Sequence, residues 1–243
     1  MKTLTKLLCF AMIMTTASVQ ASALFNNSHY SLKQNEERQI RNFNGVAVSG
    51  SIKAIVKIGT EERIRLEGDP DAIAQLITEV KDGILIIRPK TKWMDWNRKF
   101  NNTKITAYIT AKRLSSLTMS GSGSIEVQNP VVETELSATL SGSGNIKVTA
   151  EVKSFNAVIS GSGNIVVSGK ANEANITING SGSVKGTALS VAVASTTISG
   201  SGSIYVNATK KINAVTSGSG SVYYSGNPSV DKTVIGSGGV RRN

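Results

Sequence analysis

The hexapeptide Ser141-Gly142-Ser143-Gly144-Asn145-Ile146 sets the architecture of this chain, because close copies of it recur from residue 120 to residue 240. The first glycines of successive copies lie 18 to 21 residues apart. A fixed period near 20 residues is typical of a solenoid, in which each repeat forms one coil stacked on the next. These first glycines are Gly121, Gly142, Gly161, Gly180, Gly200, Gly218 and Gly236.

Apolar residues stand at fixed positions on both sides of these glycines. The position two residues before the first glycine and the positions four and six after it are mostly apolar, whereas position five is mostly charged or aromatic. Alternation with a period of two indicates two strands per repeat, each with one face toward the core. Position four, for example, holds Ile125, Ile146, Ile165, Val184, Ile204, Val222 and Val240.

The glycines lie between the two strands, where the chain has to turn a sharp corner. Glycine adopts positive φ there without a Cβ penalty. Stacked coils lie about 4.8 Å apart, so we expect ladders of hydroxyl and amide groups, and a stacked pair of Tyr205 and Tyr223 at one position of adjacent repeats. Two alternatives fit less well. A flexible Gly/Ser linker would not carry β-branched residues in register, and a propeller blade needs about 40 to 50 residues.

Residues 1–23 have the three parts of a secretory signal peptide: a basic start, a short apolar run at 7–14 and small residues at 21–23. The apolar run is too short to span a bilayer, and we expect no transmembrane segment in the mature chain. The protein is therefore expected to be exported to the periplasm, the outer surface or the medium. Cys9, the only cysteine, falls in the removed part, so the mature protein needs no disulfide.

The mature chain is predicted to form a single domain. A polar lead-in at 24–40 precedes it, and the domain itself covers 41–243. Removal of Lys2 and Lys6 lowers the formal net charge from +11 to +9, which suits a protein that works near anionic envelope polymers.

The first part of this domain shows short strands and one helix. The segment Val48-Ser49-Gly50-Ser51-Ile52 looks like a truncated corner, so degenerate coils are expected to begin there. Asp69-Pro70-Asp71 is a helix start. The apolar residues that follow have helical spacing up to Gly83, which predicts a helix that covers an open end of the solenoid. These apolar residues are Ile73, Leu76, Ile77 and Val80.

A basic aromatic stretch, Arg88 to Lys104, interrupts the pattern and contains both tryptophans. Such a stretch can bind an anionic glycan or another anionic envelope polymer through stacking and charge attraction. Nucleic acid is not expected as the partner of an exported protein. The alternative is that the indoles pack over the solenoid while the lysines stay in water. The candidate ligand-binding residues are Lys90, Lys92, Trp93, Trp96, Arg98 and Lys99.

The chain shows no set of residues for catalysis, for a metal or for a cofactor. Calcium-binding β-rolls need recurring aspartates, and Asp231 is the only aspartate in residues 119–243. His29, the only histidine, stands alone in the polar lead-in. A polysaccharide lyase or hydrolase is the enzymatic alternative. Glu133 and Glu135 share one face if their segment is a strand, but no column of carboxylates recurs on neighbouring coils.

The signal peptide, the early strands, the helix after Gly68-Asp69, the tryptophan-containing basic stretch and the serial Ser-Gly-Ser-Gly repeats together resemble the bacterial head-GIN-domain family, described as auto-transporter adhesins. The resemblance covers roughly residues 40 to 240. It implies a right-handed parallel β-helix, a location in the envelope or at the surface, and no catalytic residues. We expect no translocator in these 243 residues, so autotransport is not expected of this chain.

Taken together, the sequence predicts an all-β parallel β-helix with one short helix in its N-terminal part. Its expected role is an exported cell-envelope or surface module for binding or adhesion, without catalytic activity. A purely structural envelope protein is the alternative. The oligomeric state is left open by the sequence.

Overall fold

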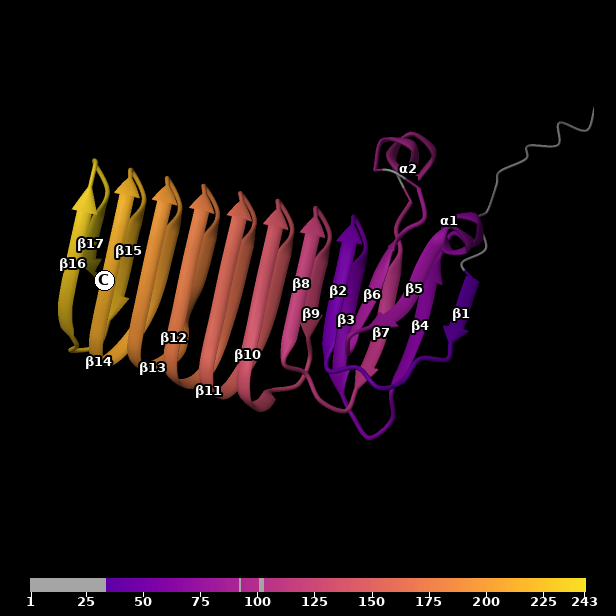
Figure 1. Cartoon of the computed structure of the whole chain (residues 1–243), viewed down its shortest axis with the longest axis horizontal. Coiled ribbons are helices and arrows are strands. Elements are labelled where there is room, and N and C mark those ends of the chain that lie inside the picture. The colour runs from indigo at the N-terminus through magenta and orange to yellow at the C-terminus, as the bar shows by residue number, and fades with distance from the viewer. Residues whose placement is uncertain (1–33, 92, 101–102) are drawn as a thin grey trace, which may run out of the picture. The chain divides into compact units, whose positions relative to one another are not determined.

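The computed structural model of this chain describes residues 34–91, 93–100 and 103–243. These residues form stacked coils of β-strands, which confirms the predicted parallel β-solenoid (Figure 1). The predicted signal peptide at 1–23, His29 and most of the predicted lead-in lie outside the described residues.

The segment before the repeats contains β1 (Gln34–Arg38), β2 (Gly45–Gly50), β3 (Lys53–Ile58), β4 (Arg63–Gly68), α1 (Pro70–Ala74), β5 (Leu76–Lys81), β6 (Ile84–Pro89), α2 (Trp93–Phe100) and β7 (Thr106–Ala111). The repeats form β8 (Ser116–Gly121), β9 (Ser124–Val127), β10 (Val131–Gly142), β11 (Asn145–Gly161), β12 (Asn164–Gly180), β13 (Ser183–Gly200), β14 (Ser203–Gly218), β15 (Ser221–Ser225), β16 (Ser229–Ile235) and β17 (Gly239–Arg242). In the described part, neither helix is long and apolar enough to cross a membrane.

Successive coils pair in parallel, and they are in register around the corners, so like residues stack on like residues there; shifts occur farther from the corners, between β12 and β13 and between β13 and β14. The pairing of β11 with β12 runs from Asn145 opposite Asn164 to Gly161 opposite Gly180. The predicted side-chain ladders are present, since the amide of Asn164 donates to Asn145 Oδ1 at 3.2 Å. The rings of Tyr205 and Tyr223 stack with centroids 4.9 Å apart, which confirms the predicted pair.

The core lies between the strand that enters each Ser-Gly corner and the strand that leaves it. The predicted inward columns are buried on both sides of the corners up to Val222, whereas Tyr224 and Val240 at the C-terminal end are half-buried and Val234 and Arg242 are exposed. A polar residue interrupts one column, because Thr216 is buried where the other coils carry an aliphatic side chain or methionine. The column two residues before the glycine contains the buried residues Met119, Leu140, Ile159, Ile178, Ile198 and Thr216.

The two glycines of a corner are needed for different reasons. The first glycine of every copy has positive φ, between 112° and 132°, as predicted. The second glycine is limited by space instead. A Cβ on Gly202 would lie 2.7 Å from the carbonyl oxygen of Gly182 and 2.7 Å from Cγ2 of Ile178. The coils can therefore approach each other at the corner only where neither position carries a side chain.

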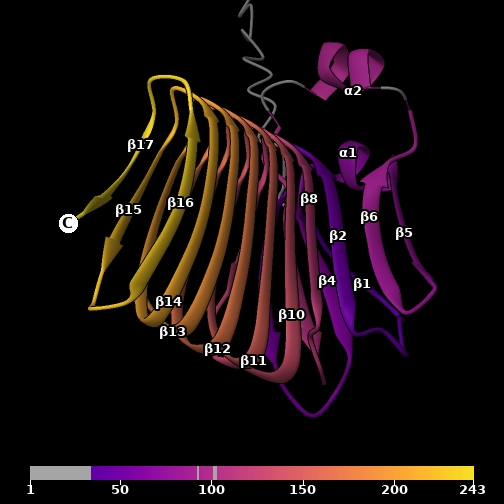
Figure 2. The ribbon, with the colours of Figure 1, turned by 60° about the vertical axis from the view of Figure 1, so that its left-hand side comes forward.

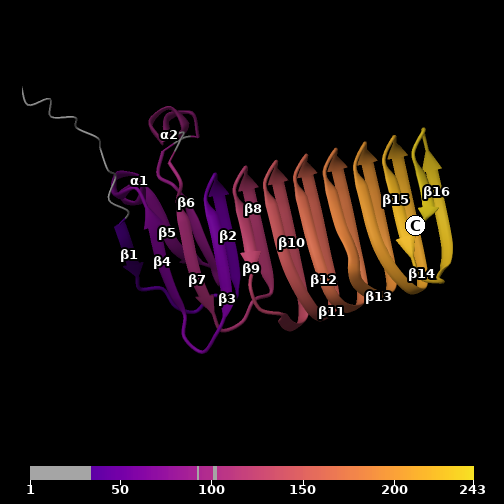
Figure 3. The same ribbon diagram turned by 180° about the vertical axis from the view of Figure 1, so that it is seen from behind.

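The spatial order of the first coils differs from their order in the sequence. β2 pairs on one side with β8, with Ser49 opposite Ser120 and Gly50 opposite Gly121, so the truncated corner is the corner of a coil. On its other side β2 pairs with β6. β3 likewise lies between β9 and β7, and Figure 3 shows these strands side by side. The coil formed by β6 and β7 is therefore stacked outside the coil that precedes it in the chain.

Antiparallel strands continue the sheet beyond this outermost coil. β4 pairs antiparallel with β7, and β1 pairs antiparallel with β4. The end of the predicted polar lead-in is ordered, because the backbone of β1 is paired along its whole length from Gln34 to Arg38.

The predicted helix before Gly83 was wrong in its second half. α1 begins as expected, with the Asp69 side chain accepting from the amide of Ala72, but it ends at Ala74. Residues 76–81 form β5, which pairs antiparallel with β6. Asp82 and Gly83 both have positive φ, 51° and 74°, as a two-residue hairpin turn requires. Residues 76–81 form a strand rather than a helix because their backbone N–H and C=O groups hydrogen-bond to β6.

Candidate functional site

The basic aromatic stretch takes the place of a corner. β6 is in register with β2 and β7 with β3, so the segment between β6 and β7 stands where the neighbouring coils have a Ser-Gly turn. This segment contains α2, whereas the sequence predicted a single short helix, the one after Asp69. Figure 1 shows α2 beyond the row of corners that lines this edge of the solenoid. The predicted binding stretch is thus an insertion into that row.

The insertion begins with Lys90 and Thr91, which we call its stem, and this stem is hydrogen-bonded to the end of α1. The backbone amide of Lys90 donates to the carbonyl oxygen of Gln75 at 2.9 Å. The Lys90 ammonium group donates to the carbonyl oxygen of Ala74, the last residue of α1, at 2.6 Å. A cation at a helix C-terminus is stabilised by the free carbonyl groups there. Lys90, one of the predicted ligand-binding residues, therefore holds the insertion in position.

The described side chains of α2 divide into a buried and an exposed group. Trp96 is 3% exposed and Phe100 is 7% exposed, and their ring centroids lie 4.8 Å apart. The Arg98 side chain is 85% exposed and lies 3.6 Å from Asp95. Lys99 is also exposed, with its ammonium 5.2 Å from the centre of the Phe100 ring.

The structure thus brings together part of the predicted set. Arg98 and Lys99 are exposed neighbours, whereas the Trp96 indole is buried beneath them. Trp93 begins α2, but its side chain is not among the described ones, and Lys92 lies outside the described residues. Binding by this stretch stays a prediction.

Two clefts flank the stem, and both reach Thr91. The helix cleft, of about 480 Å³, lies against α2. The corner cleft, of about 460 Å³, lies along the row of corners. The helix cleft is lined by Gln75, Thr91, Asp95, Arg98, Lys99 and Phe100. The corner cleft is lined by Ser49, Gly50, Arg88, Pro89, Thr91, Ser120, Gly121, Ser122, Gly142 and Ser143.

The corner cleft was not foreseen from the sequence. This cleft forms only because the coils of β2, β8 and β10 lie side by side and the insertion lies next to them. The resemblance of residues 48–52 to a corner was the signal that could have placed Ser49 and Gly50 beside Ser120 and Gly121. The cleft offers serine hydroxyls and one guanidinium group, a combination that suits a hydroxylated anion.

The cations of the two clefts are weakly paired. Arg88 lies 3.4 Å from Glu79, and both side chains are nearly half exposed. Arg98 lies 3.6 Å from Asp95 in an exposed pair. Exposed ion pairs contribute about 0 to 1 kcal/mol, so an anionic ligand can displace these carboxylates at small cost.

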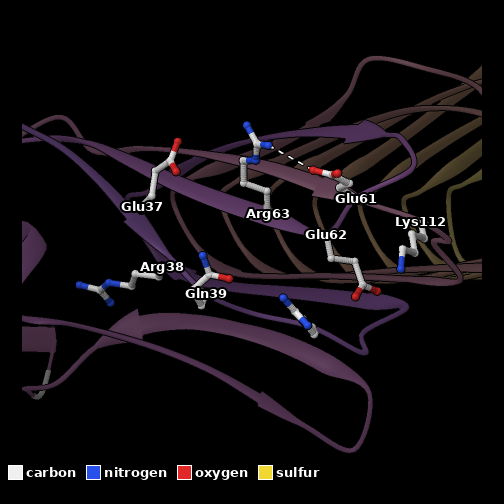
Figure 4. Close-up of a pocket in the computed structure, with 8 residues that line it drawn as sticks. Glu37, Arg38, Gln39, Glu61, Glu62, Arg63 and Lys112 are labelled. Atoms are coloured by element: carbon white, nitrogen blue, oxygen red, sulfur yellow. Dashed lines mark hydrogen bonds and ion pairs between the residues drawn. The ribbon is translucent and has the colours of Figure 1, made fainter.

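A third cleft, of about 480 Å³, is lined by charged residues of both signs near β1 and β4 (Figure 4). Four of its eight lining residues, Arg38, Glu61, Glu62 and Arg63, bond to other groups of the protein. Arg63 pairs with Glu61 at 3.3 Å, and Glu62 accepts from the backbone amide of Asn42 at 2.8 Å. Arg38 donates to the carbonyl oxygens of Ile73 and Leu76, both at 3.0 Å. These bonds fasten β1 to α1 and the start of β5, so this cleft is explained by the fold.

The two glutamates considered for hydrolysis are bound to neighbours. Glu133 accepts two hydrogen bonds from Arg113, at 2.7 and 2.9 Å, and this guanidinium group lowers the pKa of the Glu133 carboxyl below its usual value. A general acid for glycoside cleavage needs a raised pKa instead. Glu135 accepts from the side chain of Asn156 at 2.7 Å. In the described ranges, no three His, Cys, Asp or Glu residues lie close enough to hold a metal ion.

Solved structures similar to this chain include proteins from Bacteroides and Parabacteroides. A "putative adhesin" from Bacteroides fragilis NCTC 9343 is 23% identical, with a TM-score of 0.77 over 87% of this chain and 97% of that chain. A "putative lipid binding protein" from Parabacteroides distasonis ATCC 8503 is 24% identical, with a TM-score of 0.70 over 87% of this chain and 96% of that chain. At these identities the likeness concerns the fold. No curated protein matches the sequence.

A family model described as "Putative auto-transporter adhesin, head GIN domain" matches residues 42–228, which is more than half of the chain. The match takes in the truncated first corner, the insertion with α2 and six of the seven Ser-Gly copies. The chain therefore belongs to the head GIN domain family, the family that this model describes.

Proposed function

We propose that this protein is an exported binding or adhesion module of the cell envelope, which holds an anionic glycan or envelope polymer and catalyses no reaction. The observation that carries the proposal is the insertion at the corner row, which presents Arg98 and Lys99 at the helix cleft and Arg88 at the corner cleft. The family description and the relatives described as adhesins agree with this role. Export rests on the signal peptide predicted at 1–23.

The ligand is proposed to lie along the row of corners and across the stem. Serine hydroxyls of consecutive coils would contact the hydroxyl groups of a sugar, and Arg88, Arg98 and Lys99 would contact its carboxylate, sulfate or phosphate groups. Coils repeat at about 4.8 Å, close to the length of one sugar residue, so an extended chain can meet equivalent groups on each coil.

The test is binding of the protein to an array of neutral and anionic bacterial glycans, with lipopolysaccharide as one probe. Lipopolysaccharide carries both anionic sugar and lipid, so it also probes the property named for the Parabacteroides relative. We expect binding to anionic members only, weakened by added salt because screening reduces the attraction of exposed charges.

The variant Arg98→Ala/Lys99→Ala should lose most of this binding, because both side chains are exposed and their removal leaves the fold intact. Lys210→Ala/Lys211→Ala is the matched control, since it removes two adjacent exposed cations from β14 at a distance from the corners. Equal losses in both variants would show that binding depends on net charge alone. Absence of binding to every probe would favour the purely structural role instead.

A further inference from the structure

The three outward columns nearest the corners, on one face of the solenoid, carry no charged residue over seven consecutive coils, whereas the next outward column of the same strands carries Glu135, Glu173 and Lys211. The three columns lie on the outer face of the strand segments that run into the corners, on β2, β8, β10, β11, β12, β13 and β14, whose strands Figure 2 shows from the C-terminal side. The register of these strands aligns the residues of each column, and we call this uncharged part of the surface the uncharged face.

The column next to the corners contains Ser49, Ser120, Ser141, Ser160, Asn179, Ser199 and Ser217. The middle column contains Ala47, Thr118, Thr139, Val158, Thr177, Thr197 and Val215. The third column contains Gly45, Ser116, Ser137, Asn156, Asn175, Ser195 and Asn213.

This composition is unusual for a surface that meets only water. The chain has 27 lysine and arginine residues and 16 acidic residues, so charge is plentiful elsewhere. The opposite face carries charge at one outward column, which includes Glu126, Lys147, Lys185 and Arg241. Soluble surfaces normally intersperse charges of both signs. The absence of charge from all three columns nearest the corners, over seven coils, therefore points to a contact that excludes charge.

The chemistry of the uncharged face suits a second copy of itself. Hydroxyl and amide groups both donate and accept hydrogen bonds, so two identical faces can satisfy each other about a two-fold axis. Val158 and Val215, which are 38% and 44% exposed, add methyl groups to the middle column. Two mature molecules, each with a formal net charge of +9 without Lys2 and Lys6, repel each other, and they can approach most closely where neither presents a cation.

We propose that the uncharged face is a self-association surface that docks onto the same face of a second copy of this chain. Seven coils at about 4.8 Å and five residues along each strand at about 3.3 Å make a face of roughly 34 Å by 17 Å. Two such faces bury about 1,100 Å² in total, which reaches the lower limit of specific protein interfaces, about 1,000 Å². This contact is independent of the proposed glycan site at the corners.

The test is sedimentation velocity of protein purified from cells that express the full chain, from about 1 to about 100 µM, the range expected for an interface of this size. We expect a monomer–dimer equilibrium that shifts toward dimer as salt is added. Salt screens the repulsion between two basic molecules, and the interface has no ion pair to weaken. A dimer that dissociates in salt would contradict the proposal.

The variant Thr177→Lys places a lysine in the middle column and should weaken the dimer at least about a hundredfold, because a charge is buried without a partner. Thr187→Lys is the matched control, since this exposed threonine of β13 lies outside the three columns, and it should leave the dimer unchanged. Circular dichroism checks the fold of each variant, and Ser160→Lys, in the exposed column next to the corners, replaces any variant that fails to fold.

A protein that is monomeric at every concentration and salt level would overturn the proposal. So would equal weakening by Thr177→Lys and Thr187→Lys, because the contact would then lie elsewhere. If the monomer instead binds a neutral polysaccharide and Thr177→Lys abolishes that binding, the uncharged face belongs to the polymer and self-association is wrong.

Discussion

The substitution Gly202→Ala tests why the second glycine of a corner is needed. The added Cβ would lie 2.7 Å from the carbonyl oxygen of Gly182 and 2.7 Å from Cγ2 of Ile178. The oxygen is part of the backbone and the isoleucine is buried and β-branched, so neither atom can easily move aside. Contact distances near 3.5 Å require each separation to grow by about 0.8 Å.

The cost follows from this displacement. The amide of Ser203 donates to the same Gly182 oxygen at 3.1 Å, and separation of the two coils by this amount breaks that hydrogen bond. Loss of one backbone hydrogen bond costs about 1 kcal/mol, and overpacking of a core costs about 1 to 3 kcal/mol. We expect Gly202→Ala to lower the free energy of unfolding by about 2 to 4 kcal/mol.

Urea denaturation followed by circular dichroism measures this change. Ser201→Ala is the first control, because this exposed neighbour shares the corner and should have little effect. Gly239→Ala is the second, because the Cβ would meet only the flexible Arg241 side chain, at 3.2 Å. The reasoning is refuted if Gly202→Ala costs less than about 1 kcal/mol, or no more than the two controls.

Three further substitutions test the packing and the charges. Thr216→Val should raise the free energy of unfolding by about 1 kcal/mol, because Oγ1 of Thr216 is buried without a hydrogen-bond partner in the described structure; a lower urea midpoint would contradict this. Arg113 lowers the pKa of Glu133, chiefly by its hydrogen bond, so this pair contributes stability above the ordinary carboxyl pKa that is lost as the pH falls through the lowered value. Glu133→Gln should remove that part of the acid dependence, seen as a flatter stability profile below about pH 4.5. Trp96→Ala should loosen α2, because the indole packs on Phe100, and should speed trypsin cleavage within the helix while the sheet signal in circular dichroism stays unchanged.

The repeats were predictable because their determinants are local and recur. Each coil carries the same alternation of inward and outward residues, and each corner carries the same glycines, so seven copies reinforce one interpretation. The stacked tyrosines followed from position alone, since residues at one place in adjacent coils must lie one strand spacing apart.

The wrong predictions concern segments that lie outside the repeats. Leu76, Ile77 and Val80 fit the spacing of a helix, yet they lie on β5, paired with β6. The pair Asp82-Gly83 is itself a strong hairpin signal and should have outweighed the apolar spacing. Helix α2 was not predicted, because its basic and aromatic residues suggested binding rather than regular structure.

The sequence by itself determined that the chain is a parallel solenoid, how long each coil is, which side chains face the core and where the corners lie. These properties depend on residues close together in the chain. Only the tertiary structure decided that the coil of β6 and β7 stacks outside that of β2 and β3, and hence that α2 stands in the row of corners. The order of coils depends on which strand edges pair, and backbone hydrogen bonds are alike at every edge, so the sequence of a single strand does not specify its neighbour.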